Sequence, residues 1–234
     1  MGKVMFFIAH DDDVILSSAG LIQRLIADGN EVSVVLFANG ETSHQVVLDI
    51  KKNPTPAEVA QKRRIEFLKA MELLGISIGN ITFFDFPTRK VVENKPTGVD
   101  AVMCIIQKEK PQEIYFNYPD CHIDHRAVSD IVWEAFLRTP DYQKPVVKRF
   151  VIWTDELSAG RNDVDIVLAP EIPSKAEIFS LTEHELAVKR KAIFEVHSQV
   201  ETWPYPEWQP QEKPILDANF LKYFLRGEEI FVPV

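Results

Sequence analysis

The sequence contains little cysteine and no long apolar run. Of its 234 residues only Cys104 and Cys121 are cysteines, too few for a disulfide framework, so an intracellular compartment is favoured. No apolar run approaches the ~20 residues that a membrane-spanning helix needs. The amino terminus lacks a signal-peptide pattern, because Lys3 is followed at once by a short apolar run and then by charged residues. We therefore expect a cytoplasmic protein without a membrane anchor.

Positive charge is also scarce. The chain has 26 Lys and Arg against 35 Asp and Glu, a formal net charge of −9. Nucleic-acid binding needs clustered Lys and Arg, and an acidic protein is repelled by anionic membranes. The turn after the first apolar run lacks the G-x-G-x-x-G pattern that binds a dinucleotide. These absences argue against nucleic acid, membranes and dinucleotides as partners.

Apolar runs alternate with segments of helical periodicity along the chain. This alternation predicts a single doubly wound, Rossmann-like α/β domain over residues 1–234, with a mostly parallel sheet of about five to seven strands. The predicted strands are Val4–Ala9, Glu31–Phe37, Ile81–Phe84, Ile114–Phe116, Val146–Trp153, Val164–Leu168 and Glu229–Val232. The predicted helices are Val14–Ala27, Pro56–Leu74, Val99–Lys108, Arg126–Leu137, Glu183–Val196 and Asn219–Leu225.

Two segments lack a clear period. Residues 42–55 predict a loop or a frayed helix, on which His44 is expected to be exposed to solvent. Residues 200–234 begin with a stretch rich in Pro and aromatic residues, which we expect to be irregular and to pack on the domain. Such a tail either forms a wall of a substrate cleft or packs in a homo-oligomer interface.

One imidazole and three carboxylates follow the first predicted strand directly. They are His10, Asp11, Asp12 and Asp13, and ligands of open α/β sheets bind at such carboxyl ends. Three adjacent carboxylates repel one another unless a cation compensates them. The plainer interpretation is a solvated acidic turn that caps the following helix. His10 favours the metal, because His with Asp is a ligand set for borderline metals.

A second cluster, His122-Ile123-Asp124-His125, follows another predicted strand. Both clusters end strands of one sheet, so they can meet. His10, Asp13 and His125 would then supply three ligands and leave a fourth position for water, the layout of a catalytic zinc site. The mixed nitrogen and oxygen set also admits other divalent metals.

The neighbouring polar residues suggest a division of labour. Asp12 adjoins the ligand Asp13 and is expected to act as the general base toward water. A protonated His122 would donate a hydrogen bond to the developing oxyanion, and Asp124 would keep it charged by raising its pKa. Asp120 would orient His122 or contact substrate, unless it is only a turn residue.

These motifs, in this order, resemble the LmbE-like/PIG-L family of zinc deacetylases. The resemblance covers about residues 3 to 200. It is carried by AHDDD, the helix ending in Ala-Asp-Gly, the strand Glu31–Phe37, Asn39-Gly40-Glu41, HIDH, Arg63-Arg64-Ile65-Glu66 with Ala70 and Leu74-Gly75, and Lys191-Ala192-Ile193 with His197-Ser198-Gln199. The usual family motifs are HPDDE and HPDH or HxxH. Asp11, Val14 and Ile123 depart from them, although none of these three is an expected ligand.

The resemblance implies a zinc-dependent N-deacetylase that hydrolyses the N-acetyl group of an amino sugar or a related small conjugate. It also implies that Arg63 reaches into the site and holds substrate hydroxyls. The alternative function is a non-catalytic metal- or sugar-binding module of the same fold. An enzyme is favoured because Asp12 remains available as a base beside the ligands. A phospho-acceptor receiver domain would explain Asp85 after the third strand, but it has no use for His10 or for the second cluster.

Overall fold

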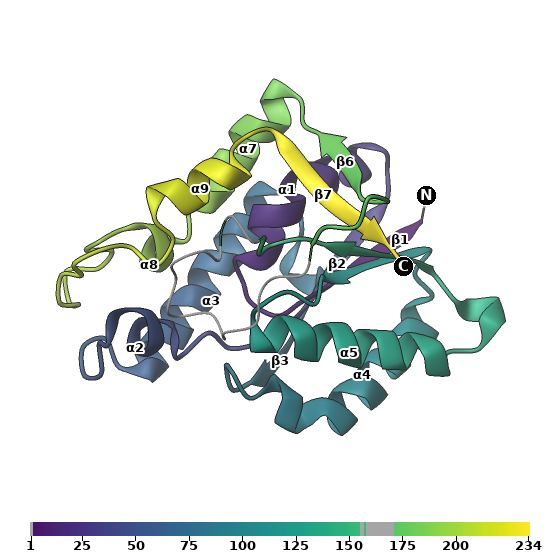
Figure 1. Ribbon diagram of the computed structural model, residues 1–234, viewed down its shortest axis with the longest axis horizontal. Coiled ribbons are helices and arrows are strands. Elements are labelled where there is room, and N and C mark those ends of the chain that lie inside the picture. The colour runs from purple at the N-terminus through teal and green to yellow at the C-terminus, as the bar shows by residue number, and fades with distance from the viewer. Residues whose placement is uncertain (1, 155–156, 158–170) are drawn as a thin grey trace.

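The protein, described here from a computed structural model for residues 2–154, 157 and 171–234, is built on one seven-stranded sheet (Figure 1). The strand order is β3-β2-β1-β4-β5-β7-β6. The strands are β1 (Lys3–Ile8), β2 (Glu31–Ala38), β3 (Ile81–Phe86), β4 (Glu113–Asn117), β5 (Val146–Phe150), β6 (Glu177–Ser180) and β7 (Glu228–Pro233). The first strand lies in the interior, so the chain winds outward from it in both directions, as the doubly wound prediction requires.

Strands β1 to β5 are paired in parallel, whereas β7 runs antiparallel to both of its neighbours. Parallel neighbours need crossover connections, which the helices provide. The helices are α1 (Asp13–Ala27), α2 (Ser43–Leu48), α3 (Pro56–Leu73), α4 (Lys95–Glu109), α5 (Ile123–Arg138), α7 (Glu183–Phe194), α8 (His197–Val200) and α9 (Ala218–Phe224). Short 3-10 turns lie at Ile78–Asn80, Val91–Asn94 and Asp141–Gln143.

The two faces of the sheet are covered by different helices. Helices α4 and α5 lie together below the sheet in Figure 1, and α1, α3, α7 and α9 lie on the other side. Successive residues of β1 therefore enter different cores: Phe6 packs with the α1 and α3 side and Phe7 with the α4 and α5 side. Because both faces are buried, β1 is apolar without alternation.

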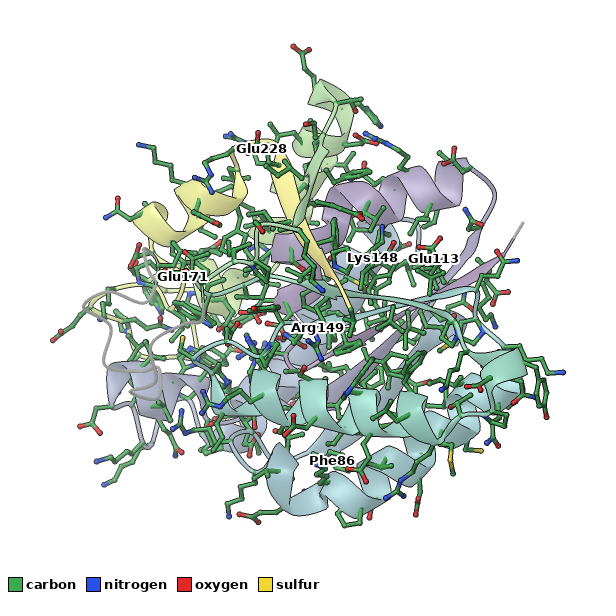
Figure 2. The ribbon with its side chains drawn as sticks, turned by 45° about the vertical axis from the view of Figure 1, so that its right-hand side comes forward. Phe86, Glu113, Lys148, Arg149, Glu171 and Glu228 are labelled. Carbon is green, nitrogen blue, oxygen red and sulfur yellow. The ribbon has the colours of Figure 1, made fainter. Side chains whose placement is uncertain are left out.

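Helix α4 begins four residues before the predicted start at Val99, so Gly98 lies inside it. A Cβ atom on Gly98 would lie 3.1 Å from Ile131 Cδ1 of α5 and 3.6 Å from the ring of Phe86. Phe86 lies beside α4 in Figure 2. The glycine thus permits a close approach of the helices that outweighs its low helix propensity.

Other boundaries also differ from the prediction. Strand β5 ends at Phe150, three residues before the predicted end, and β6 was not predicted. Its sequence Glu-Ile-Phe-Ser is short, and it lies at the edge of the sheet beside β7.

Residues 42–55 include the short helix α2. The predicted strand Val164–Leu168 lies outside the described residues. None of the helices within the described ranges is both long and apolar enough to cross a membrane.

Candidate metal centre and active site

The two polar clusters are brought together by the pairing of β1 with β4. Phe7 lies opposite Phe116 in this parallel pair, so both strands end at the same edge of the sheet. The chain then enters α1 through Asp11 and Asp12, and it enters α5 through His122. This arrangement places the two clusters side by side at the point where the strand order changes direction, as expected.

Three side-chain atoms converge between the clusters. His10 Nδ1 lies 3.3 Å from His125 Nε2, and Asp13 Oδ1 lies 3.2 Å from His125 Nε2 and 3.9 Å from His10 Nδ1. Tetrahedral ligands with bonds of ~2.0–2.2 Å lie roughly 3.3–3.6 Å from one another. All three side chains are buried. Their spacing and chemistry therefore fit a single divalent cation.

Each of the two imidazoles is held by a carboxylate on its other nitrogen. Asp124 Oδ2 lies 3.1 Å from His10 Nε2, and Asp120 Oδ2 lies 2.8 Å from His125 Nδ1. Such carboxylates fix the tautomer and the orientation of metal-binding histidines. The histidine atoms that face each other are thereby left to point inward, toward Asp13.

The carboxylate of Asp13 is oriented by a residue that the sequence interpretation missed. Asn117, the last residue of β4, donates from Nδ2 to Asp13 Oδ2 over 2.8 Å and accepts from the backbone N–H of Ala9 over 2.9 Å. The N–H of His10 also donates to Asp13 Oδ2. Asp13 Oδ1 is thus left to face the imidazoles. The sequence does carry one signal for this role: Asn117 is the polar residue at the end of β4, which pairs with β1.

Carboxylates surround the two imidazoles of the centre. Burial disfavours the charged form of His10, but hydrogen bonds that His10 donates to Asp124 and Asp13 outweigh this effect and raise the pKa of His10 to about 9. The pKa of His125 is likewise raised by Asp120 and Asp13 against the effect of burial. The pKa of Asp13 is lowered, because the two imidazoles outweigh its burial. The carboxylates thus stabilise positive charge at His10 and His125.

Asp120 is not placed as a substrate-binding residue. Its side chain is buried, Oδ1 accepts from the backbone N–H of His122, and Oδ2 accepts from His125 and from the backbone N–H of Trp153. The prediction of a substrate contact is therefore corrected: the carboxylate holds His125 and the turn before α5.

His122 caps α5 and faces the cavity. Its Nδ1 accepts a hydrogen bond from the backbone N–H of Asp124 over 3.2 Å, so the ring is neutral and carries its proton on Nε2. Its ring stands edge-on to that of His10, with centroids 4.6 Å apart. Burial and the positive charge on His10 and His125 lower the pKa of His122. The cap also explains why α5 begins at Ile123, three residues before the predicted start.

The expectation that Asp124 keeps His122 charged is therefore wrong. The carboxylate of Asp124 accepts from His10 and from the backbone N–H of Arg89 and Val91. Only its backbone N–H reaches the ring of His122. The carboxylate of Asp124 therefore holds the ring of His10.

Asp12 lies at the first turn of α1 with its carboxylate in the cavity wall. Its nearest ion-pair partner in the described part of the chain is Arg63, with Nη2 at 3.6 Å from Asp12 Oδ1. Burial raises the pKa of Asp12 to about 6; Asp11 and Asp13 add to the shift and Arg63 opposes it. Asp12 thus lies beside His10 and Asp13, and its carboxylate pairs with Arg63.

Arg63 also reaches the cavity, but its guanidinium is engaged by the protein. Its Nε donates to Asp11 Oδ2 over 2.8 Å and its Nη2 pairs with Asp11 Oδ1. Both side chains are buried, so the aspartate that replaces the common proline neutralises a buried cation. The contact of Arg63 with substrate hydroxyls that the resemblance implies stays a prediction.

The cavity around these residues has about 680 Å³ of empty space, part of which is open solvent. Its polar lining residues include the histidines, Asp12, Thr88 and Arg89. Its apolar lining residues are Leu16, Val46, Val47, Ile152, Trp153, Ile215, Leu216 and Phe220. Part of the carboxy-terminal tail therefore forms a wall of the cavity, one of the two roles expected for it.

His44 is fully buried, contrary to the expectation that it is exposed. It lies on α2, and its Nε2 is 2.9 Å from Gln211 Nε2 in the tail. Its ring stands edge-on to that of Trp208. The aromatic stretch of the tail folds over α2 and encloses the histidine, a long-range contact that local sequence does not show.

Solved structures with this fold include enzymes of two kinds. N,N'-diacetylchitobiose deacetylase from Pyrococcus horikoshii is 19% identical, with 100% of this chain and 84% of that chain covered at a TM-score of 0.69. The zinc-inhibited form of teicoplanin deacetylase Orf2 is 14% identical, with coverage of 99% and 98% and a TM-score of 0.66. GalB, a 4-carboxy-2-hydroxymuconate hydratase from Pseudomonas putida, is 20% identical, with 85% of each chain covered and a TM-score of 0.60. At these identities the likeness establishes the fold, and the hydratase shows that the fold alone does not fix the reaction.

No match was found among curated proteins. The family model described as PIG-L, GlcNAc-PI de-N-acetylase, matches residues 5–136, which is more than half of the 234 residues and includes both polar clusters. The chain therefore belongs to the PIG-L family.

Proposed function

We propose that this protein is a metal-dependent hydrolase that removes the N-acetyl group from an amino sugar. One observation carries the proposal: three side-chain atoms of ligand type converge in the cavity beside the carboxylate of Asp12, which pairs with Arg63 but accepts no side-chain hydrogen bond among the described residues. The family's de-N-acetylase description and the chitobiose and teicoplanin deacetylases support the sugar and the acetyl group. A non-catalytic module would not need a further carboxylate, that of Asp12, beside these three residues.

His10, Asp13 and His125 would hold the cation. Zn²⁺ suits this set, and Fe²⁺, Mn²⁺ or Ni²⁺ are alternatives. When bound, such a cation lowers the pKa of a water molecule and polarises a carbonyl group. Asp120, Asp124 and Asn117 would keep the three ligand atoms in place, because each fixes the far side of one ligand.

Asp12 and His122 would divide the proton transfers and the charge stabilisation. Asp12 takes the proton of the water that attacks the acetyl carbon. The carbonyl oxygen then gains negative charge, and His122 donates a hydrogen bond to it from Nε2. This donation needs no charge on the ring, because Nδ1 is the acceptor of the Asp124 N–H. Asp12 returns its proton to the amine, which leaves as the amino sugar while acetate is released.

A panel of N-acetylated sugars, assayed for acetate and for free amine with the metal-loaded protein, tests the proposal. The expected result is equal release of acetate and amine from at least one sugar. Binding of such a sugar without release of either product would instead support the binding module. Conversion of an unsaturated acid without acetate release would support a hydratase.

A further inference from the structure

The carboxylate of Asp12 has one charged partner of opposite sign in the described part of the chain. Asp12 is the N-cap residue of α1, but its side chain forms no capping hydrogen bond. Its ion pair is with Arg63, whose Nη2 lies 3.6 Å from Asp12 Oδ1. An aspartate side chain turns about two bonds, so it needs a partner to keep one orientation. Among the described residues that partner is Arg63.

Arg63 is itself fixed by residues from two other parts of the chain. Its Nε donates to Asp11 Oδ2 over 2.8 Å, and its Nη2 pairs with Asp11 Oδ1. Such a two-point contact sets the plane of a guanidinium group as well as its position. Gly40, which follows β2, lies against the same group with φ at +75°. A Cβ atom on Gly40 would lie 2.9 Å from Arg63 Nε, so only glycine leaves this room.

The three charged side chains are enclosed by the fold. Arg63 and Asp11 are 5% and 6% exposed, and Asp12 is 14% exposed. Charges at such positions are little screened by solvent. The Nη2 group of Arg63 carries two protons and lies between the carboxylates of Asp11 and Asp12. A displacement of Asp11 would therefore displace Arg63 and, with it, the partner of Asp12.

We propose that Asp11 is a positioning residue that holds Arg63, and that Arg63 in turn holds the carboxylate of Asp12 where it meets the attacking water. This inference rests on the proposed function, in which Asp12 is the base. Asp11 stands where the family commonly has proline, whose side chain cannot accept a hydrogen bond. The role of Arg63 in this chain thus differs from the contact with substrate hydroxyls that the resemblance implies.

The two roles of Arg63 predict different kinetic effects. A residue that orients the base acts only on the reaction step, so its loss lowers kcat and leaves KM nearly unchanged. A residue that holds substrate hydroxyls contributes to binding, so its loss raises KM or the Kd of the sugar. The variants Asp11→Asn and Arg63→Met therefore separate the two roles.

A further variant keeps the test valid if the single substitutions impair folding. Asp11→Asn or Arg63→Met alone leaves a buried charge without its partner, which lowers stability. The double variant Asp11→Asn/Arg63→Met removes both charges at nearly constant volume. Arg64→Met is the matched control, because Arg64 is the next residue on α3, pairs with Asp85 and is 45% exposed.

All variants are assayed on N-acetylglucosamine with metal bound. We expect kcat to fall by roughly 10- to 100-fold in Asp11→Asn, Arg63→Met and the double variant, because a small misplacement of a catalytic group has an effect of this size. KM and metal content should stay near the wild-type values. Arg63→Lys keeps the cation but not the planar fork, so it should recover part of the lost kcat. Arg64→Met should have the wild-type kcat.

Binding is also measured without turnover. Asp12→Asn removes the base, and titration calorimetry of the metal-loaded variant gives the Kd of N-acetylglucosamine. Adding Arg63→Met to Asp12→Asn should leave this Kd unchanged. A Kd that rises about tenfold, the size of one lost hydrogen bond, would show that Arg63 holds substrate hydroxyls and would overturn the inference.

The remaining outcomes separate the inference from the proposed function. An active wild type with an unchanged kcat in the double variant would overturn the positioning role of Asp11 and Arg63 alone. So would a loss of metal in parallel with activity, which would mean that the pair supports the metal centre. A metal-loaded wild type that releases acetate from none of the sugars in the panel would overturn the proposed function and the inference with it.

Discussion

The carboxylate of Asp120 lies 2.8 Å from Nδ1 of His125, on the side of the ring away from Asp13. Asp120 also accepts hydrogen bonds from the backbone N–H groups of His122 and Trp153. The buried carboxylate of Asp120 thus fixes the ring of His125. It also joins the turn before α5 to the segment after β5. Its effect on the centre is exerted through His125, because both of its oxygens are used inside the protein.

Replacing Asp120 should therefore weaken metal binding. Asp120→Asn can still accept from the backbone, but it no longer raises the basicity of the His125 ring. Loss of such a partner typically lowers metal affinity ~10- to 100-fold. Competition with a chromogenic chelator measures the affinity, and Asp141→Asn, whose side chain is 95% exposed, is the control. Unchanged affinity would show that the Asp120–His125 contact is not important for the centre.

Asp12 and His122 should affect turnover without affecting metal content. Asp12→Asn removes the base, and His122→Asn removes the oxyanion donor while keeping a good N-cap for α5. Each should lower kcat by ~10²–10⁴. Metal content and kcat are measured on the same preparations. Parallel loss of metal and activity would mean that these residues only support the ligands, and normal kcat with bound metal would contradict both roles.

Removing the cation should lower activity and stability together. A chelator should abolish turnover, and readdition of Zn²⁺ or another divalent metal should restore it. Since a ligand of the native state stabilises by about 2.7 kcal/mol at 100 times its Kd, the Tm should rise on loading. His125→Ala should lose this increase, whereas His197→Ala, at a half-buried position on α8, should keep it. A full increase in His125→Ala would contradict the ligand assignment.

The ends of β1 and β4, and the convergence of the polar clusters that follow them, were predictable from sequence because they depend on apolar runs and on the pairing of parallel strands. A buried parallel strand is a continuous apolar run, and its carboxyl end is where polar residues gather. His10, Asp13 and His125 could be proposed on this basis alone. The residues that hold these three side chains could not be predicted. Asp120, Asp124 and Asn117 contact them because of their positions in the folded chain, which no local pattern shows.

His44 and Arg63 show why the remainder was not predictable. His44 is buried by Trp208 and Gln211, which are more than 160 positions away in the sequence. Arg63 was expected to face substrate hydroxyls, but Asp11 from another element engages its guanidinium. In both cases the sequence shows a polar residue but does not show which residue it contacts in the folded chain.

Glu66 should be important for stability through the tail. Its buried carboxylate accepts from Ser198 twice and from the hydroxyl of Tyr205 over 2.7 Å. Glu66→Ala leaves a buried backbone N–H without a partner and should lower the free energy of unfolding by about 2–4 kcal/mol, whereas Tyr205→Phe should cost about 1 kcal/mol. Urea unfolding measures both. Glu72→Ala, an exposed position on the same helix, should change little, and an equal effect there would contradict the role of Glu66.

His44 should make stability depend on pH in the mildly acid range. Burial, aided by the charge of Arg63, lowers the pKa of His44 to about 4, whereas an unfolded histidine titrates near ~6.5. Below pH ~6.5 the unfolded chain therefore binds a proton that the folded chain does not, and stability falls as the pH is lowered toward 4. His44→Phe keeps a ring against Trp208 but cannot titrate. Between pH 7.5 and 4.5, the wild type should lose about 2–3 kcal/mol more than this variant. Urea unfolding of both proteins in chelator, where the metal centre contributes equally, measures the difference, and parallel pH profiles would show that His44 is protonated in the folded protein.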